Sequence, residues 1–533
     1  MNGLRRVVNN TLISLVGQAI TWASTLMLTI AYGRFLGDVK FGELYFAITF
    51  VGLIGFPIEF GFNQQITRDV AQDTSKAQKY LSSTLLMKTL LWCTFYVCML
   101  FIAWHLNYDS EVRTLVVICG LTLLSGAITN TFISLHYAFE RVIYPVIGTI
   151  LEKGLAALIG FLLLKAHASV EVMALVLLGG SLVNAIWQAC TFFRRVGFSF
   201  SVDWHLTRGL IRTSIPFLTY GVLGVIYYRL DTILLSFMTN DAVIGWYGGA
   251  YRLFDTLVFL PGLVISAIMY PVFSKLSVSS ETDLKVAIEK SLNFLLFCGL
   301  PIATAMIVAA PNIIGFLYHR PDFINSIPAL QALAPGLVFL YINSVLTAIL
   351  ISTGQEKKIT IMAAAALVFN LGLNLLLIPH LQHVGAAIVT SFTELLLMGI
   401  AILVLPKRLL PSGSLRVGTK ALIASLIMAA VIALLRYWDI TNIFVILTVA
   451  TPVYFLAATL LGTIPREDLQ HLYTAVQRKA NRVSTRAFAD QDEEKQVLPL
   501  VDEALNMEEQ ALLQVDETLY DEEEQLVGSE GGQ

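Results

Sequence analysis

Residues 359–405 read ITIMAAAALVFNLGLNLLLIPHLQHVGAAIVTSFTELLLMGIAILVL. This stretch holds two apolar runs, 359–379 and 384–405, which are separated only by a short turn containing His380 and His383. Each run has the roughly 20 residues that an α-helix needs to cross the hydrocarbon core of a bilayer. Because a backbone in lipid must satisfy its own hydrogen bonds, both runs are predicted to be transmembrane helices.

The same pattern fills most of the chain. Hydrophobic residues make up 56% of the 533 residues and charged residues only 14%, whereas soluble domains carry about 25% charged residues. This composition excludes an ordinary soluble enzyme and predicts an all-α polytopic membrane protein. We count fourteen predicted spans, at residues 11–33, 41–62, 81–105, 114–135, 145–164, 172–194, 212–237, 243–272, 288–310, 328–352, 359–379, 384–405, 416–437 and 442–463.

The basic residues predict the orientation of these spans. If the N-terminus is cytoplasmic, the cytoplasmic segments hold 25 of the 35 Lys and Arg residues, the opposite side holds 6 and the spans hold 4. Cytoplasmic loops of membrane proteins carry such an excess of basic residues. We therefore predict a multi-pass protein of the cell's inner (plasma) membrane with both termini in the cytoplasm.

The C-terminal tail divides into two parts of opposite charge. Residues 464–489 are rich in basic residues, which suits a juxtamembrane segment lying on anionic lipid. Residues 490–533 hold 15 acidic residues and one base, which predicts a disordered, solubilising tail, with a docking helix for a basic partner as the alternative. The basic excess of the remaining chain is explained by anionic lipids, and no nucleic-acid partner is expected.

An internal repeat predicts two similar halves. The spacing D-x-x-x-G-x-x-x-x-A occurs twice at an offset of 203 residues, each time at the start of an even-numbered span, in the residues Asp38, Gly42 and Ala47 and the residues Asp241, Gly245 and Ala250. Both copies then share one orientation, as in a parallel structural repeat.

The repeat leads to a division of the chain into domains. We predict an N-terminal six-helix bundle at 1–205, a C-terminal six-helix bundle at 206–405 and two additional transmembrane helices at 406–463. The two bundles are expected to be related by a pseudo-twofold axis along the membrane normal. Such a pair encloses a central cleft that can open to either side of the membrane.

Motifs for catalysis or for cofactors are missing. The nearest approach to a phosphate-binding loop, GSLRVGTK at residues 413–420, has Lys and Thr exchanged and opens a membrane helix. His380 and His383 form an isolated H-x-x-H in a loop, which is a weak metal signal. We expect a transporter rather than an enzyme, with no cofactor and no metal.

Ionisable residues inside the spans are the candidate site. Burying a charge in the bilayer centre costs about 2.5–3.5 kcal/mol on insertion scales, so such residues are expected to face the interior. Arg229 and Asp231 lie in the seventh span, and Arg252 and Asp255 lie at a similar depth in the eighth. The two arginines could form an anion site. Alternatively, Asp231 and Asp255 could each pair with Arg252 as a brace, or the two roles could alternate during transport.

Four further residues form a second group. Lys88 and Lys153 are candidates for contact with an anionic substrate, although their long side chains could instead reach an interface. Glu394 lies too deep for this, and could either carry a coupling ion or be a hydrogen-bonded structural residue. Glu152, next to Lys153, is assigned the same pair of alternatives, ion coupling or bracing.

The residues around this candidate site resemble a known family. The run YRLDTILLSFMTNDAVIGWYGGAYRLFDTLVFLPGLVISAIMYPVFSKL at 228–276 is similar to the signature of polysaccharide transporters in the MATE-like flippase superfamily. The run LGDVKFGELYFAITF at 36–50 and the region of Glu59, Gly61 and Arg68 resemble the same family. The resemblance covers all fourteen spans and omits the acidic tail.

The resemblance implies a flippase for a polyprenyl-diphosphate-linked oligosaccharide, such as an O-antigen or exopolysaccharide repeat unit. Arginine suits a diphosphate because its planar fork binds two oxygens at once. The acidic tail could then engage other polysaccharide-assembly proteins.

Two rival functions are retained. A multidrug antiporter of the same superfamily would need acidic residues to dominate its cleft, whereas here two arginines accompany the two aspartates. A membrane glycosyl ligase or polymerase would need a long outer loop with converging polar groups, and the longest outer connection, 311–327, has few of them.

Overall fold

The computed structural model describes residues 2–59, 61–197, 201–411 and 413–463. The two predicted tail segments, 464–489 and 490–533, lie outside this range. The first half contains the α-helices α1 (Asn2–Gly55), α2 (Phe62–Gln72), α3 (Ala77–His105), α4 (Ser110–Ala138), α5 (Ile143–Lys165) and α6 (Val170–Val196), with short 3₁₀ turns at Phe56–Ile58 and Thr74–Lys76.

The second half begins with α7 (Trp204–Met238) and α8 (Asp241–Leu257). It continues through α9 (Phe259–Pro261), the π-helix η3 (Gly262–Met269), α10 (Tyr270–Ser279), α11 (Glu281–Val308), α12 (Ala310–Tyr318), the 3₁₀ turn η4 (Pro321–Asn325), α13 (Ser326–Ser352) and α14 (Glu356–Val404). A 3₁₀ turn (Lys407–Leu409) then leads to α15 (Ser414–Tyr437) and α16 (Ile443–Leu460). The described residues contain no β-strand.

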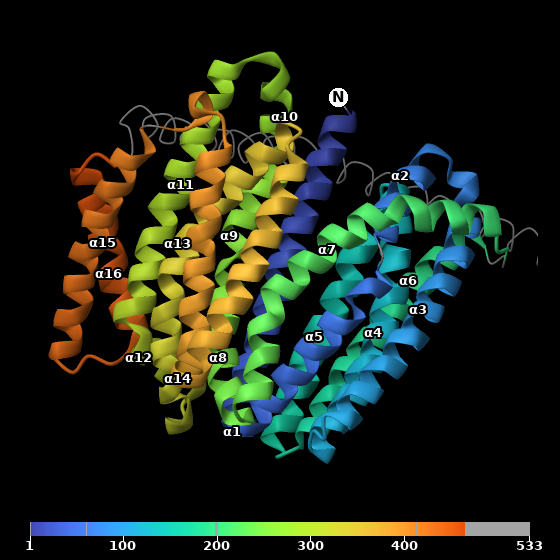
Figure 1. Ribbon diagram of the computed structural model, residues 1–533, viewed down its shortest axis with the longest axis horizontal. Coiled ribbons are helices and arrows are strands. Elements are labelled where there is room, and N and C mark those ends of the chain that lie inside the picture. The colour runs from blue at the N-terminus through green and yellow to red at the C-terminus, as the bar shows by residue number, and fades with distance from the viewer. Residues whose placement is uncertain (1, 60, 198–200, 412, 464–533) are drawn as a thin grey trace, which may run out of the picture. The chain divides into compact units, whose positions relative to one another are not determined.

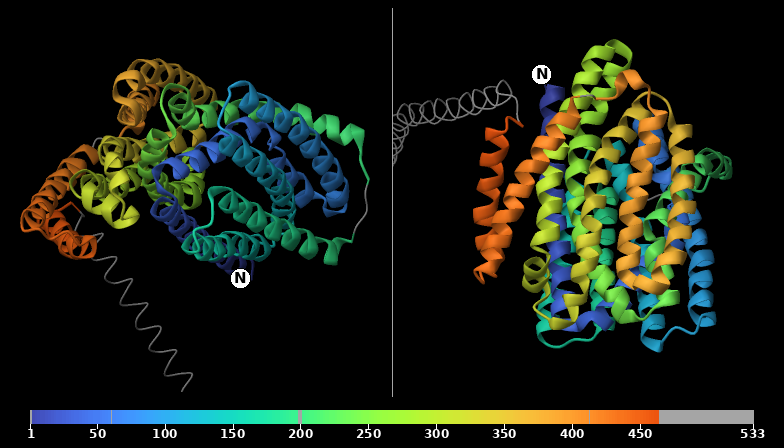
Figure 2. Two further views of the ribbon diagram at one scale, coloured as in Figure 1. Left: turned by 90° about the horizontal axis from the view of Figure 1, so that it is seen from below. Right: turned by 60° about the vertical axis from the view of Figure 1, so that its left-hand side comes forward.

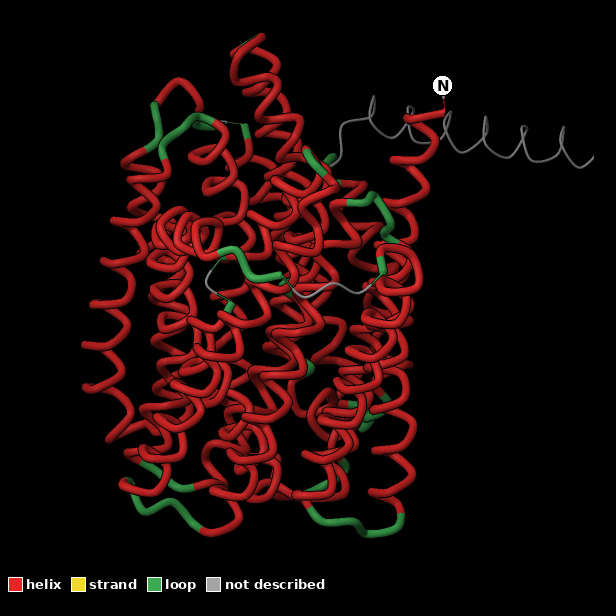
Figure 3. Tube along the Cα trace, turned by 90° about the vertical axis from the view of Figure 1, so that its right-hand side faces the viewer, coloured by secondary structure: helices red, strands yellow, loops and turns green. Residues whose placement is uncertain are grey.

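The predicted all-α membrane fold is confirmed. Among the described residues, eleven helical segments are long and apolar enough to cross a membrane. Two of them each contain two predicted spans, because the backbone of α1 leaves helical geometry at Gly37 (φ 86°) and that of α14 does so at Gln382 (φ 48°). With the span predicted in α7, these segments account for all fourteen predictions. Most loops lie at the ends of the helices (Figure 3).

The helices pack in two groups within one compact unit that runs to Leu461. Helices α1 and α3 to α6 contact one another, and α7, α8, α11, α13 and α14 do the same. Helices α15 and α16 pair with each other, and α15 packs against α11 (Figures 1 and 2). The two groups meet chiefly where α1 contacts α8 and α7. The domain boundaries at 205 and 405 remain predictions.

The two copies of the internal repeat face each other at this contact. A Cβ atom placed on Gly42 would collide with the backbone carbonyl oxygen of Asp241, and one placed on Gly245 would collide with the carbonyl oxygen of Asp38. Each copy therefore supplies a glycine and receives a carbonyl, as a pseudo-twofold relation requires. Only a residue without a side chain lets two helix backbones approach so closely.

Polar contacts reinforce this seam, which we define as the meeting of α1 with α8 and α12 around Gly42 and Gly245. The Trp246 indole donates a hydrogen bond to Asp38 Oδ2 at 2.9 Å. The Arg34 guanidinium donates to the backbone carbonyls of Phe316 at 2.6 Å and Leu317 at 2.5 Å. The seam thus joins the two halves at the kink of α1 and at the start of α8, both of which were predicted to face outward.

Replacing a seam glycine with alanine should destabilise the protein. In Gly245→Ala the new methyl group meets a fixed backbone carbonyl, and overpacking of this kind costs about 1–3 kcal/mol. In the matched variant Gly372→Ala the methyl group meets open space in α14, and alanine gains helix propensity. Thermal denaturation in detergent should show a lower Tm for Gly245→Ala and an unchanged or higher Tm for Gly372→Ala. Equal Tm values would contradict the close backbone contact.

Candidate functional site

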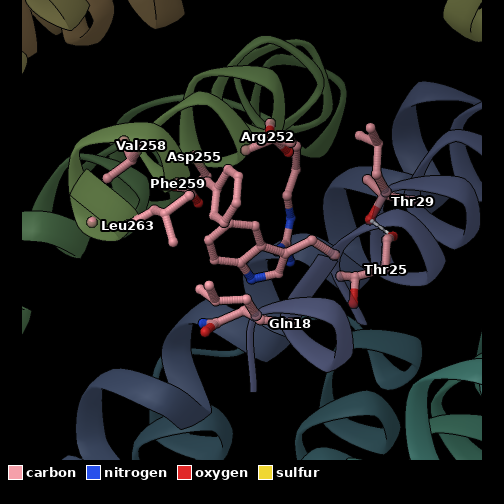
Figure 4. Close-up of a pocket in the computed structure, with 13 residues that line it drawn as sticks. Gln18, Thr25, Thr29, Arg252, Asp255, Val258, Phe259 and Leu263 are labelled. Carbon is pink, nitrogen blue, oxygen red and sulfur yellow. Dashed lines mark hydrogen bonds between the residues drawn. The ribbon is translucent and has the colours of Figure 1, made fainter. Parts of the chain in front are cut away.

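A cavity of about 690 Å³ lies between the two halves. One wall is the part of α1 from Leu15 to Thr29, and the other runs from Arg252 in α8 to Leu263 in η3 (Figure 4). On both helices these residues lie beyond the seam, toward the side on which α1 begins. The volume of the cavity falls within the range of about 300–1,000 Å³ that is usual for ligand pockets.

The α1 wall presents polar and aromatic side chains in a transmembrane span. Gln18, Trp22, Thr25 and Thr29 follow each other at intervals of three and four residues, which places them on one helix face. The hydroxyl of Thr29 donates to the carbonyl of Thr25 at 2.9 Å, so its hydrogen bonding is satisfied within the helix. This face is absent from the residues predicted for the site, although the spacing of its polar residues was a usable signal.

Arg252 extends from the opposite wall and is in no ion pair among the described residues. Its guanidinium carbon lies 5.4 Å from the ring centre of Tyr45, a residue of α1. The contact is a cation–π interaction, which favours the positive charge but uses none of the guanidinium hydrogen-bond donors. Arg252 therefore brings an available cation to the boundary between the two halves.

Asp255 lies one turn further along the same face and binds Arg229. Both terminal nitrogens of Arg229 lie 3.4 Å from Asp255 Oδ2, and the two side chains are 28% and 21% exposed. Arg229 also stacks over the rings of Tyr228 and Tyr251. A brace between the seventh and eighth spans thus exists, but the predicted pairing of Asp255 with Arg252 is wrong.

Asp231 lies away from the cavity, and its predicted pairing with Arg252 is also wrong. Its side chain is buried and accepts hydrogen bonds from the Thr232 backbone N–H at 2.7 Å and from the Tyr247 hydroxyl. The reason is helical geometry: residues two apart in a helix point in nearly opposite directions, so Asp231 cannot share a face with Arg229.

Lys88 is enclosed within the first half. Its side chain is 1% exposed, and its ammonium donates to Glu59 Oε2 at 2.7 Å, to Asn63 Oδ1 at 2.9 Å and to the carbonyl of Ala127 at 3.1 Å. All three of its donors are thus used, and Lys88 is not among the cavity-lining residues. The role of Glu59 as its partner was missed because the two residues are 29 positions apart.

Glu152 and Lys153 form a second pair in the first half. The Lys153 ammonium lies 2.6 Å from Glu152 Oε1, and the Asn184 amide donates to Glu152 Oε2 at 2.7 Å. The Lys153 side chain is 37% exposed. Neither residue lines the cavity described above, so the assignment of Lys153 to substrate contact and of Glu152 to coupling or bracing stays a prediction.

Glu394 lies in the second half of α14 and is buried. It accepts hydrogen bonds from the Tyr227 hydroxyl and from the Asn343 amide, both at 2.7 Å. This geometry fits the hydrogen-bonded alternative and leaves ion coupling a prediction. Among the residues that the structure describes, no group of three or more His, Cys, Asp or Glu side chains could hold a metal ion.

The fold and the cavity together define a polytopic membrane protein with two packed helical halves and a central arginine-containing cavity. Residues 7–277 match the family of polysaccharide biosynthesis proteins, and residues 216–376 match the MatE family. The chain belongs to the polysaccharide biosynthesis protein family. The resemblance found in the sequence is thereby confirmed.

Three curated relatives are similar to parts of the chain. An uncharacterized membrane protein, MJ1068 of Methanocaldococcus jannaschii, is 30% identical over 35% of this chain and 38% of its own length. The probable lipid II flippase MurJ of Rickettsia prowazekii is 25% identical over 36% and 39%. The match to the probable low-salt glycan biosynthesis flippase Agl15 of Haloferax volcanii is 21% identical and covers 68% and 75%. The chain thus covers less than half of the length of each of the first two relatives.

Solved structures confirm the architecture. The lipid II flippase MurJ in an inward closed conformation superposes with a TM-score of 0.70 at 16% identity, covering 86% of this chain and 99% of that chain. An inward-facing multidrug resistance MATE transporter superposes with a TM-score of 0.60 at 16% identity, covering 77% and 98%. At these identities the likeness establishes the fold alone.

Breaking the Lys88–Glu59 pair should be costly. Removing one member of a buried ion pair leaves an uncompensated charge and destabilises by about 3–5 kcal/mol; because Glu59 is 26% exposed, we expect Lys88→Met to lose about 3 kcal/mol. The double variant Lys88→Met/Glu59→Gln should recover part of this loss. Chemical denaturation in detergent micelles measures both, and a double variant no more stable than the single one would contradict the pairing.

Proposed function

We propose that the protein is a flippase that moves polyprenyl-diphosphate-linked oligosaccharide units from the cytoplasmic to the outer leaflet. The proposal depends above all on one observation: Arg252 lies at the wall of a cavity between the two halves and forms no ion pair with any other described residue. Names of relatives such as the probable low-salt glycan biosynthesis flippase support the same substrate class.

The cavity chemistry suits the two ends of a lipid-linked sugar. A guanidinium with free donors can bind a diphosphate through two parallel hydrogen bonds. The polar face of α1 offers an amide and an indole to sugar hydroxyls, since Gln18 and Trp22 line the same cavity. Arg229 is a second cation nearby, held by Asp255, and it becomes available if the brace opens.

The position of the seam supports transport by alternating access. The cavity is on one side of the Gly42–Gly245 contact, and the seam closes the other side. Opening the seam while the opposite ends of the halves close would expose the same cavity to the other leaflet. With the orientation proposed from the basic residues, the cavity side is cytoplasmic.

The remaining assignments complete the proposal. Asp231, Asp255, Glu394 and Glu152 couple an ion to transport or brace the bundles, and Lys153 contacts the anionic part of the substrate. Anionic lipids attract the basic segment 464–489, and the acidic tail engages other polysaccharide-assembly proteins. Lys88 was predicted to contact an anionic substrate; because its donors are already occupied, we assign it instead to holding the first half together.

Arg252→Ala should abolish most of the flipping. Charge-assisted hydrogen bonds contribute about 1.5–3 kcal/mol, so the initial rate should fall roughly tenfold or more. Arg252→Lys, which keeps the charge but loses the planar fork, should be intermediate. The assay uses liposomes containing the purified protein and a fluorescent polyprenyl-diphosphate sugar, and measures how much of it becomes accessible to an impermeant quencher.

Arg408→Ala is the matched control for this experiment. It also removes an arginine, but Arg408 pairs with Glu281 on the surface and is 70% exposed. It should flip at the wild-type rate. Wild-type rates in Arg252→Ala would overturn the assigned anion site. Exchange of organic cations by a wild-type protein that flips no lipid-linked sugar would move the chain to the multidrug antiporter alternative.

A further inference from the structure

A groove lies on the surface of the second half, between η3 and the first part of α11. It has a volume of about 470 Å³ and shares no lining residue with the central cavity. Most of its lining is apolar. The lining residues that decide its chemistry are Val264 and Met269 of η3 and Asp283, Val286, Lys290 and Phe294 of α11. We call it the α11 groove.

The α11 groove faces the lipid of the membrane. Val286 and Phe294 are 48% and 46% exposed. Apolar side chains exposed at a membrane-spanning segment contact acyl chains, which are as apolar as leucine. The span predicted in α11 begins at residue 288, so the groove extends from the hydrocarbon to the level of the lipid head groups. With the orientation proposed above, these head groups belong to the cytoplasmic leaflet.

The side chains that α11 contributes to the groove are ordered by polarity. Asp283, Ala287, Lys290 and Phe294 are spaced by four, three and four residues and therefore share one helix face. Phe294 lies deepest in the membrane, and Lys290 lies one turn nearer the head groups. Asp283 lies about 10 Å beyond Lys290 along the helix. From the hydrocarbon outward the groove thus presents an apolar, a basic and an acidic group.

A zwitterionic phospholipid has the complementary order. Its acyl chains, its phosphate and its ammonium follow one another in the same direction, so each meets a group of matching chemistry. A phosphate accepts hydrogen bonds from a lysine ammonium, and a carboxylate accepts them from a primary ammonium. An anionic head group without an ammonium would instead place negative charge beside the Asp283 carboxylate.

We propose that the α11 groove binds one phospholipid whose head group carries a primary ammonium. An acyl chain packs against Val264, Met269 and Phe294, the phosphate binds Lys290 and the ammonium binds Asp283. This lipid is a bound component of the protein and not the transported substrate. It also differs from the anionic lipids assigned to the basic tail segment, because the groove selects a head group with no net charge.

The bound lipid would contact the part of the eighth span that changes from α-helix to π-helix. Val264 and Met269 line the α11 groove, whereas Gly262 and Leu263 of the same π-helix line the central cavity. A lipid in the groove therefore packs against the segment that forms one wall of that cavity. An effect of the lipid on transport rests on the proposed function, whereas its binding does not.

Native mass spectrometry of the purified full chain in detergent, with added dioleoyl phospholipids, measures an affinity for each head group. Phosphatidylethanolamine should bind more tightly than phosphatidylglycerol or phosphatidylcholine, because it alone combines a phosphate with ammonium N–H donors. Asp283→Asn should lower the ratio of the phosphatidylethanolamine affinity to the phosphatidylglycerol affinity about fivefold, the effect of one exposed ion pair. Lys290→Met should weaken both lipids alike, because both contain the phosphate.

Glu281→Gln is the matched control for Asp283→Asn. It removes the other acidic residue from the first turn of α11, but Glu281 pairs with Arg408 and does not line the groove. The affinity ratio should therefore stay unchanged. Ala287→Trp should abolish the preference for phosphatidylethanolamine by filling the groove while both charges remain. Monodisperse gel filtration and an unchanged Tm establish that each variant is folded.

Three results would overturn the proposal. One is a wild-type chain that binds phosphatidylglycerol or phosphatidylcholine as tightly as phosphatidylethanolamine. The second is an equal change of the affinity ratio in Asp283→Asn and Glu281→Gln, and the third is a preference that survives Ala287→Trp. None of these results bears on sugar flipping, which is measured separately.

Discussion

The close backbone contact between α1 and α8 is the constraint on which the rest of the structure depends. Gly42 and Gly245 each admit a carbonyl oxygen of the other helix, so the axial position of one helix against the other is fixed to within a residue. Arg252 lies seven residues after Gly245, or about 10 Å along the helix. That distance carries it past the seam to the level of Tyr45 and the cavity. A shift of one residue would turn its side chain by about 100° and away from the other half.

The ionisable residues in the spans differ in how many hydrogen bonds and ion pairs the protein itself provides for them. Lys88 has its three donors occupied in a buried network that connects α3 to α2, to α4 and to the turn before α2. Arg229 makes two longer hydrogen bonds to Asp255, both at 3.4 Å, in a partly exposed setting. Arg252 rests on an aromatic ring and retains its donors. A charge in a membrane interior is costly unless hydrogen bonds or an opposite charge compensate it. Arg252 has the fewest such partners of the three, so its position requires water or a ligand.

The sequence was sufficient for the fold because each span is encoded locally by a run of apolar residues, and the repeat at Asp38 and Asp241 is visible by its spacing alone. The candidate site was predicted only in part. Arg229 and Asp255 do contact each other, but the two ion pairs predicted for Arg252 do not form. Which residues of two helices pair depends on how each helix is rotated about its own axis, and the sequence does not specify that rotation. The opposite directions of Arg229 and Asp231 followed from two-residue spacing in a helix and were open to prediction. The pair joins Lys88 in α3 to Glu59 in the turn before α2, and no local pattern indicates it.

The eighth span has a first part that is held in place and a second part that can bend. Its first part, around Gly245, is held by the seam and cannot move without separating the halves. Beyond Val258 the hydrogen-bonding pattern changes at Pro261 and becomes a π-helix over Gly262–Met269. Prolines and π-segments are the usual places where a helix bends, because the regular hydrogen-bond ladder is interrupted there. A Cβ on Gly262 would meet nothing within 4 Å, so this part of the cavity wall has open space beside it. The span can therefore reshape the central cavity from its second part while its first part keeps the seam closed.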